Sequence, residues 1–411
     1  MPRPDRLVAP ALGALWTNRA QLRFAWDVLR HAVCNDCSLG ASGLSDGILS
    51  GSHLCRRRLR RLPRVTAQPF APTALTDVST LPTDRRALRA MGRIPCPLLW
   101  RAGQAGFAPV GWTDATHLLA ARVRDARTHS AWSLLVDPGD VGLETLFQLR
   151  RVTRLLERRD RTDLGLPPVM DLLTSPEERA LRHGARQHLG TWGSTATVGA
   201  LQPGDPVAVR SVGDHPLLDD VLDALRARGV LAERTETWSD TVRHTLVYGA
   251  PGVFGALACG LTLAPAPPDW EALTAAWIVG EHAGPPPAAA FRAHQAAFLD
   301  PSMLPPAAEA VLLLPSELAT ETAGGASFLA DDGTLRYSPK VLGHGVPDAA
   351  AGWEIAVRVA AHVDPAAATD LAAHDSAEIR RALAAAYPDL AALADFARPG
   401  DVGALSPSPS R

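Results

Sequence analysis

Three of the five cysteines in this chain of 411 residues lie close together, at Cys34, Cys37 and Cys55. The first two form a C-x-x-C pair, which places two thiolates on one tight turn where a metal ion or an iron–sulfur cluster can bind both. A [4Fe–4S] cluster normally takes four thiolates and no fourth cysteine lies nearby, whereas zinc could take His53 as its fourth ligand. We therefore predict a metal site, iron–sulfur or zinc, with structurally idle reduced cysteines as the alternative.

An arginine-rich run over residues 56–61 follows Cys55 directly. It could neutralise an anionic cofactor or cluster, although a solvated helix face is the commoner meaning of such a run. The whole chain has a formal net charge of -2. It therefore has no overall positive field, and we do not expect a nucleic-acid partner.

The composition, 46% hydrophobic and 20% charged residues, is that of a globular protein that can bury a sizeable core. Polar residues such as Asn18 and Arg19 interrupt the apolar residues near the N-terminus, so no secretion signal is evident. No stretch reaches the roughly 18 apolar residues that a membrane-spanning helix needs. An odd number of cysteines in a long chain argues against a secreted disulfide framework. We expect a cytoplasmic protein without a membrane span.

The hydrophobic pattern divides the chain into four regions. We predict a cysteine-containing head over residues 1–62, a connector with a short β segment over 63–112, an α/β body over 113–400 and a disordered tail over 401–411. In the body, the periodicity predicts strands and helices in alternation, which is typical of a parallel sheet. The predicted strands are 132–136, 207–212, 245–249, 257–263 and 311–315, with a further strand that begins at Val230, and the predicted helices are 113–124, 141–158, 218–225, 351–363 and 376–386. The strand 207–212, the helix 218–225 and the strand from Val230 form a βαβ unit, and Asp375-Ser-Ala-Glu378 is a capping-box-like start for the last helix.

Two loops follow predicted strands at the positions where ligands collect in open parallel sheets. They are Gly213, Asp214, His215 and Pro216 after the strand 207–212, and Ser316 and Glu317 after the strand 311–315. Asp214 and His215 could form an acid/base pair, and a helix-capping aspartate beside an ordinary surface histidine is the alternative. The chain has neither a dinucleotide glycine fingerprint nor a P-loop, so these loops name no particular ligand.

Several segments, in a shared order along the chain, resemble the molybdopterin-dependent oxidoreductases, in the branch of formate dehydrogenase alpha subunit-like proteins. The segments are 24–26 leading into 32–44 with His53-Leu-Cys55, 92–98 followed by 106–115, 298–315 with Gly324-Gly325, 336–339, and 353–355. The resemblance implies a parallel-sheet, Rossmann-like α/β body that holds molybdopterin guanine dinucleotide with molybdenum or tungsten. It also implies an iron–sulfur cluster on Cys34, Cys37 and Cys55, and redox chemistry on a small-molecule substrate with a redox partner protein.

The same resemblance assigns cofactor contacts, and it also shows where this chain departs from the family. The loop 213–216 and the turn Gly324-Gly325 are the implied contacts to the cofactor. In active relatives a Cys, Ser or selenocysteine ligand follows the helix that corresponds to 141–158, whereas Leu173 and Thr174 stand here before Pro176. Leucine cannot ligate molybdenum. The alternative function is therefore a catalytically inactive, truncated paralogue that acts as a metal-binding or accessory subunit, and a zinc-stapled α/β protein unrelated to molybdenum is a third hypothesis.

Overall fold

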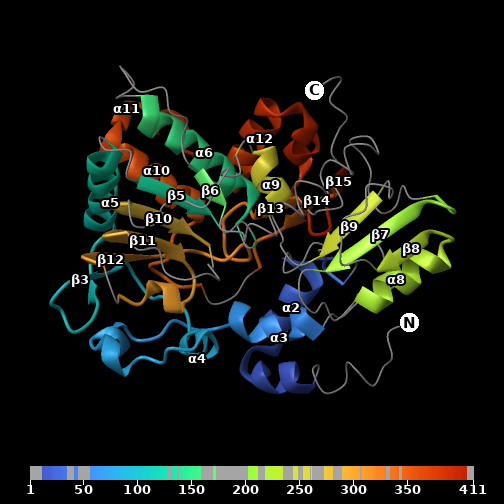
Figure 1. Ribbon diagram of the computed structural model, residues 1–411, viewed down its shortest axis with the longest axis horizontal. Helices are drawn as coiled ribbons and strands as arrows, with labels where there is room; N and C mark the ends of the chain where they lie inside the picture. Colours follow the sequence, from blue (N-terminus) through green and yellow to red (C-terminus); the bar gives the residue numbers. More distant parts are fainter. Residues whose placement is uncertain are drawn as a thin grey trace.

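The computed structural model describes residues 12–34, 41–44, 56–127, 132–136, 139, 141–158, 170–172, 202–211, 218–234, 244–248, 253–259, 261, 273–280, 289–305, 308–329, 334–341 and 345–404. Their fold is mixed α/β (Figure 1). Its main sheet has seven strands in the order β4-β3-β12-β11-β10-β5-β6.

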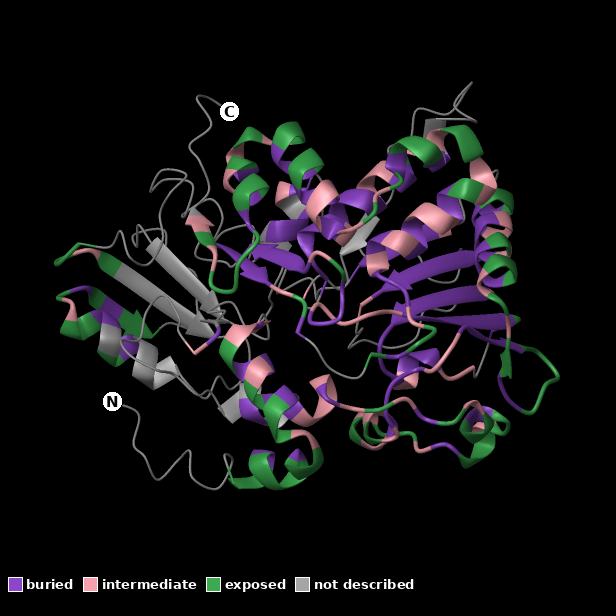
Figure 2. Ribbon diagram, turned by 180° about the vertical axis from the view of Figure 1, so that it is seen from behind, coloured by how far each residue is buried: buried purple, intermediate pink, exposed green. Residues whose placement is uncertain are grey.

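The centre of the main sheet is parallel. Its parallel strands are β5 (Trp132–Val136), β6 (Met170–Leu172), β10 (Ala275–Val279), β11 (Phe291–Ala296) and β12 (Ala310–Pro315). The antiparallel edge consists of β3 (Leu98–Arg101) and β4 (Ala108–Pro109). Every residue of β10, β11 and β12 is buried, because the sheet is covered on both faces, as parallel sheets require (Figure 2).

Different parts of the chain cover the two faces. One face packs in the large core that contains side chains of α5 (Trp112–Arg127), α6 (Leu143–Arg158) and α10 (Gly352–Val363). α11 (Pro365–Leu371), α12 (Ser376–Ala386) and the 3-10 helix η7 (Pro388–Asp395) extend this layer. The other face packs against the segment that carries η2 (Pro72–Leu75), η3 (Val78–Thr80) and α4 (Arg85–Ala90).

Two smaller sheets lie beside the main one. β13 (Ala326–Leu329), β14 (Thr334–Ser338) and β15 (Val402–Ala404) form an antiparallel sheet. β7 (Pro206–Ser211) pairs in parallel with β8 (Leu231–Arg234) and β9 (His244–Tyr248), and α8 (Leu218–Ala227) connects β7 to β8. The predicted βαβ unit is therefore present, but it forms a sheet of its own.

The N-terminal head contains a helix over 12–17, η1 (Arg19–Gln21), α2 (Leu22–His31) and α3 (Arg56–Val65), with the short antiparallel pair β1 (Val33–Cys34) and β2 (Ala41–Ser42). Its small core joins Phe24 and Val28 of α2 to Leu59 and Leu62 of α3. Val341, just after β14, belongs to the same cluster, so the head packs against the body there.

Most of the predicted elements are confirmed to within a few residues. The predicted start of the helix 376–386 is confirmed in detail, because Asp375 Oδ1 accepts from the backbone N–H groups of Ala377 and Glu378 and the Glu378 carboxylate accepts from His374 N–H. The strand predicted over 257–263 is absent from the described part of that run, because α9 (Val253–Ala258) extends into it and Cys259 and Leu261 belong to no strand. Residues 260, 262 and 263 lie outside the described residues. Short apolar runs do not distinguish a strand from a buried helix. α9 packs closely on α6, since a Cβ on Gly255 would lie 2.7 Å from Leu143 Cδ2.

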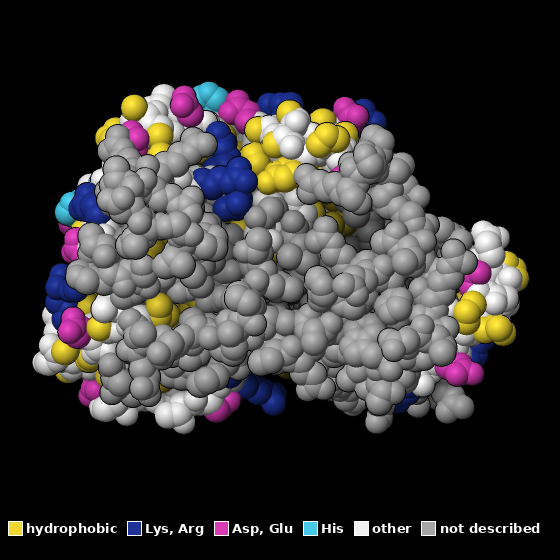
Figure 3. Space-filling view, turned by 45° about the horizontal axis from the view of Figure 1, so that its top comes forward, with side chains coloured by type: hydrophobic (Ala, Val, Ile, Leu, Met, Phe, Trp, Pro, Cys, Tyr) yellow, Lys and Arg dark blue, Asp and Glu magenta, His cyan; other side chains and the backbone are white. Residues whose placement is uncertain are grey.

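None of the helices in the described ranges is both long and apolar enough to cross a bilayer. On the face that Figure 3 shows, acidic and basic side chains are interspersed along the rim.

Candidate active site

A pocket opens at the carboxyl ends of the parallel strands, between β5 and β10. After β5 the chain continues to α6 and β6 at one edge of the sheet, whereas after β10 it continues to β11 and β12 toward the other. Connections that diverge in this way leave a crevice between the two strands. The crevice is lined by Val279 at the end of β10, by Gly280 after it, and by Val141 and Gly142 before α6, and its volume is about 70 Å³.

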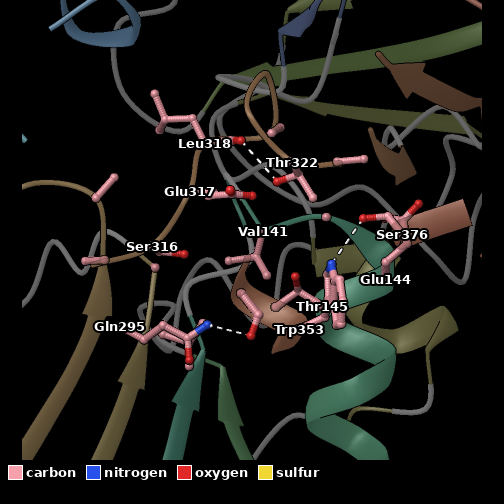
Figure 4. A pocket seen from close by; sticks show the side chains of 18 of the residues that line it. Val141, Glu144, Thr145, Gln295, Ser316, Glu317, Leu318, Thr322, Trp353 and Ser376 are labelled. Atoms are coloured by element: carbon pink, nitrogen blue, oxygen red, sulfur yellow. Dashed lines mark hydrogen bonds between the residues drawn. The ribbon is translucent and has the colours of Figure 1, made fainter. Parts of the chain in front are cut away.

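Polar side chains from both sides of the crevice face one another in it. In Figure 4, β11 and β12 reach the pocket at Gln295 and Ser316, and α6 begins on the opposite side at Glu144 and Thr145. Further labelled lining residues are Glu317, Leu318, Thr322, Trp353 and Ser376.

One wall, the loop after β12, is fixed by a buried ion pair. Arg93 donates to both oxygens of Glu321, each at 2.8 Å, and also to the carbonyl oxygen of Ser316 at 3.1 Å. Glu321 Oε2 in addition accepts from Leu318 N–H at 2.9 Å. Bidentate, charge-assisted bonds of this kind fix geometry, so the loop has a defined conformation at the pocket.

A second buried ion pair fixes the opposite wall. Glu144, in the first turn of α6, binds Arg380 of α12 at 2.8 Å and accepts from Ser327 N–H at 2.9 Å. Arg380 also donates to the carbonyl oxygen of Gly324 at 3.0 Å. Both oxygens of the Glu144 carboxylate are therefore engaged within the protein.

The turn Gly324-Gly325, predicted as a cofactor contact, allows the backbone in this wall of the pocket to pack too closely for any side chain. Gly324 and Gly325 both have positive φ, at 76° and 73°. A Cβ at Gly325 would lie 2.5 Å from the carbonyl oxygen of Ser338, so only glycine fits there. Gly325 lines the pocket.

Among the described residues that line the pocket, Glu317 has a carboxyl group whose pKa is strongly raised. Burial raises its pKa to about 7, and the neighbouring carboxylates of Glu321 and Glu354 act in the same direction. Lys340 and a hydrogen bond with Thr322 oppose the increase. A carboxyl group with a pKa near neutrality can both hold and release a proton, so Glu317 could donate a hydrogen bond to a ligand or act as an acid or base.

The structure brings together some of the predicted site residues. Ser316 and Glu317, predicted from the strand 311–315, both line the pocket. The predicted cofactor contacts Gly213, Asp214, His215 and Pro216 lie outside the described residues, as do Cys37, His53, Cys55, Leu173, Thr174 and Pro176. Over the ranges that are described, no group of three or more His, Cys, Asp or Glu side chains could hold a metal ion.

Of the three cysteines in the predicted metal site, Cys34 is the one that the structure describes. Its strand, β1, lies close to the pocket. The neighbouring Val33 N–H donates to Ser338 Oγ at 3.3 Å. Ser338 in turn pairs with Ala326 in the β13–β14 register, and Ala326 lines the pocket. One strand pair therefore separates the cysteine strand from the pocket.

Sequence reasoning missed two residues that shape the pocket. Gln295 lies on β11, which was not predicted because Arg292, His294 and Gln295 give its sequence the appearance of a polar segment. Its side chain accepts from Trp277 Nε1 at 3.2 Å and donates to the carbonyl oxygen of Gly352 at 3.0 Å. Glu144 could have been found from its position at the start of a helix that directly follows a buried strand.

The described part of the lining of this pocket does not fit molybdopterin guanine dinucleotide. The cofactor carries phosphates, which need cationic or N–H donors around them. Among the described residues that line the pocket none is lysine or arginine, and Glu317 contributes a carboxyl group. The volume of about 70 Å³ is also far below the roughly 300–1,000 Å³ typical of sites for larger ligands. No chemical step through this cofactor follows from the pocket.

Comparisons with known proteins give little further information. No protein-family model and no curated protein matches the chain. Among solved structures, the formyltransferase/hydrolase complex (FhcABCD) from Methylorubrum extorquens in complex with methylofuran is similar over 66% of this chain and 99% of that chain. The sequence identity is 11% and the TM-score is 0.42, so this likeness carries no argument about function.

Proposed function

We propose that this chain is a catalytically inactive paralogue of the molybdopterin-dependent oxidoreductases, which serves in the cytoplasm as an accessory or metal-binding subunit. The ordered sequence resemblance supports the relationship. Leu173, at the place of the expected molybdenum ligand, supports the loss of catalysis.

The observation that carries the proposal is the chemistry of the pocket at the carboxyl edge of the sheet. The carboxylate of Glu144 is occupied by Arg380 and Ser327, and that of Glu321 by Arg93 and Leu318. Among the described lining residues, Glu317 remains as the carboxyl group that can meet a ligand. This arrangement favours a small polar molecule that can share a proton with Glu317 over a large anion.

Metal and pterin content tests the proposal. The full chain is expressed with ample molybdate and tungstate, beside an active molybdenum enzyme that confirms the supply of cofactor. We expect far less than stoichiometric molybdenum and tungsten and no released pterin fluorescence. Stoichiometric molybdenum or tungsten together with released pterin would contradict the proposal.

A second candidate function is redox chemistry with an iron–sulfur cluster at Cys34, Cys37 and Cys55. The observation that favours it is the bond from Val33 N–H to Ser338 Oγ, because it brings the cysteine strand to within one strand pair of the pocket. A metal at this strand would lie near a ligand in the pocket.

Measurement of the iron and zinc content distinguishes a metal site at these cysteines from the alternative that the cysteines bind no metal. Cys34→Ser is compared with Cys96→Ser, which changes a cysteine outside the cluster. If the segment binds metal, Cys34→Ser loses iron or zinc and Cys96→Ser retains it. Equal metal content in the two variants and the wild type would remove Cys34 from the ligand set.

A further inference from the structure

The N-terminal head exposes large apolar side chains that the rest of the described surface rarely shows. Five of the seven exposed large apolar residues in the described ranges belong to residues 12–26. They are Leu12, Leu15, Trp16, Leu22 and Trp26, with exposed fractions of 60%, 56%, 71%, 45% and 50%. We call this set the head patch. The other two, Leu231 and Val402, lie on separate elements of the body.

The patch is not the unfilled core of the head. The head core takes Phe24, Val28 and Leu29 from α2, which are buried. Leu22 and Trp26 are spaced i, i+4 on the same helix but remain exposed, as do Leu12 and Trp16 on the helix before it. Isolated exposed apolar residues need no explanation, but two tryptophans and three leucines within fifteen residues mark an interaction surface.

The charge of the head identifies the kind of partner. Residues 12–31 and 56–65 contain nine arginines and one acidic residue, Asp27, although the whole chain carries a net charge of -2. Arg19, Arg23 and Arg30 are exposed beside the apolar residues, and the Arg19 guanidinium lies 4.8 Å from the centre of the Trp16 ring. Tryptophan and arginine are the residue types enriched in protein–protein hot spots.

We propose that the head patch docks an acidic surface of another protein, with Trp16 and Trp26 as anchors. A second copy of the same patch is a poor occupant, because the exposed arginines of both copies would face each other. A bilayer is also a poor occupant, because the apolar face of α2 is already buried in the head core and the exposed apolar residues alternate with arginines. The inference identifies the partner class of the proposed accessory role but rests on observations independent of the pocket.

Binding of a labelled peptide tests the inference on the full chain. The probe is an amphipathic helix of leucine and glutamate, and its matched partner has lysine in place of glutamate. We expect the glutamate peptide to bind and the lysine peptide not to bind, by fluorescence anisotropy. We further expect Trp16→Ser/Trp26→Ser to weaken the binding at least about thirtyfold, since truncation of even one hot spot costs upward of about 2 kcal/mol.

Leu231→Ser is the matched control, because Leu231 is exposed to 61% on a distant strand. It should bind the glutamate peptide as the wild type does, and circular dichroism should show all variants folded. Equal binding by the double variant and the wild type would overturn the inference. So would tighter binding to anionic phosphatidylglycerol vesicles or to an oligonucleotide than to the glutamate peptide. The metal and pterin content of the chain is a separate readout, so the failure of one proposal is distinguishable from that of the other.

Discussion

The α/β body and the N-terminal head use arginine in opposite ways. In the body, Arg93 and Arg380 are about 99% buried, and each is matched to a glutamate that has further backbone partners. In the head, Arg19, Arg23 and Arg30 are exposed beside Trp16 and Trp26. Arginine in the body therefore fixes the walls of a pocket, whereas arginine in the head is available to a partner.

This difference shows that the buried arginines of the body find their partners within the chain, whereas the exposed arginines of the head leave a basic surface. The pocket walls are held by side chains of the same chain, so their geometry does not require a ligand or a subunit. The head presents exposed tryptophan, leucine and arginine together, and protein–protein interfaces are enriched in aromatic residues and arginine. The stability of the body and the binding of the head should thus respond to different substitutions.

The largest effect is expected from breaking a buried pair of the body. Glu144→Ala leaves Arg380 buried without its carboxylate and should cost about 3–5 kcal/mol in the free energy of unfolding, measured by urea denaturation. Glu354→Ala is the control, because it breaks the surface pair Arg358–Glu354 and should cost at most about 1 kcal/mol. Equal costs for the two substitutions would refute the role assigned to the buried pair.

The pocket carboxyl group should make stability depend on pH. The pKa of Glu317 is raised from 4.5 to about 7, so the folded protein binds this proton more tightly than the unfolded chain. Its contribution to stability is full below pH 4.5 and declines as the pH rises to about 7. Glu317→Gln removes the decline and should stabilise the protein at pH 8 by up to about 3 kcal/mol, with little change near pH 4.

Urea denaturation at several pH values measures this effect. Glu309→Gln is the matched control, because the Glu309 side chain is 70% exposed, and it should leave the pH dependence unchanged. If Glu317→Gln and the wild type have the same difference in stability between pH 4 and pH 8, Glu317 is not the group responsible.

A smaller effect is expected at the glycine turn. Gly325→Ala should cost about 2 kcal/mol, because positive φ and overlap with the carbonyl oxygen of Ser338 act together. Gly103→Ala shares the positive φ but meets no atom within 4 Å, and should cost roughly 1 kcal/mol. Thermal unfolding of both variants measures the difference, and a Gly103→Ala cost as large as that of Gly325→Ala would contradict the steric role of the turn.

The smallest effect on stability is expected in the head patch. Trp16→Ser should change the free energy of unfolding by less than about 0.5 kcal/mol, because the side chain is 71% exposed. Trp277→Ala, in the completely buried strand β10, should cost about 3–5 kcal/mol. If Trp16→Ser destabilises the protein comparably, the head patch is part of the fold and the comparison between head and body fails.

The sequence predicted those helices and strands whose signals lie within a few neighbouring residues. The strand 132–136, the helix 141–158 and the capping aspartate Asp375 each follow from periodicity or from side-chain chemistry within a few residues. The loop Ser316-Glu317 was predicted because it directly follows a strongly apolar strand. β11 was not predictable, because its polar residues are buried by packing from distant parts of the chain.

By itself, the sequence determined the α/β class, the loop after β12 and the arginine-rich composition of the head. Only the tertiary structure decided that Glu144 and Glu321 are neutralised by Arg380 and Arg93, which lie 236 and 228 residues away along the chain. It also decided that Glu317 holds its proton near neutral pH, because burial, not its sequence neighbours, is the largest cause. Local patterns specify elements, whereas charge pairing and desolvation depend on which elements fold together.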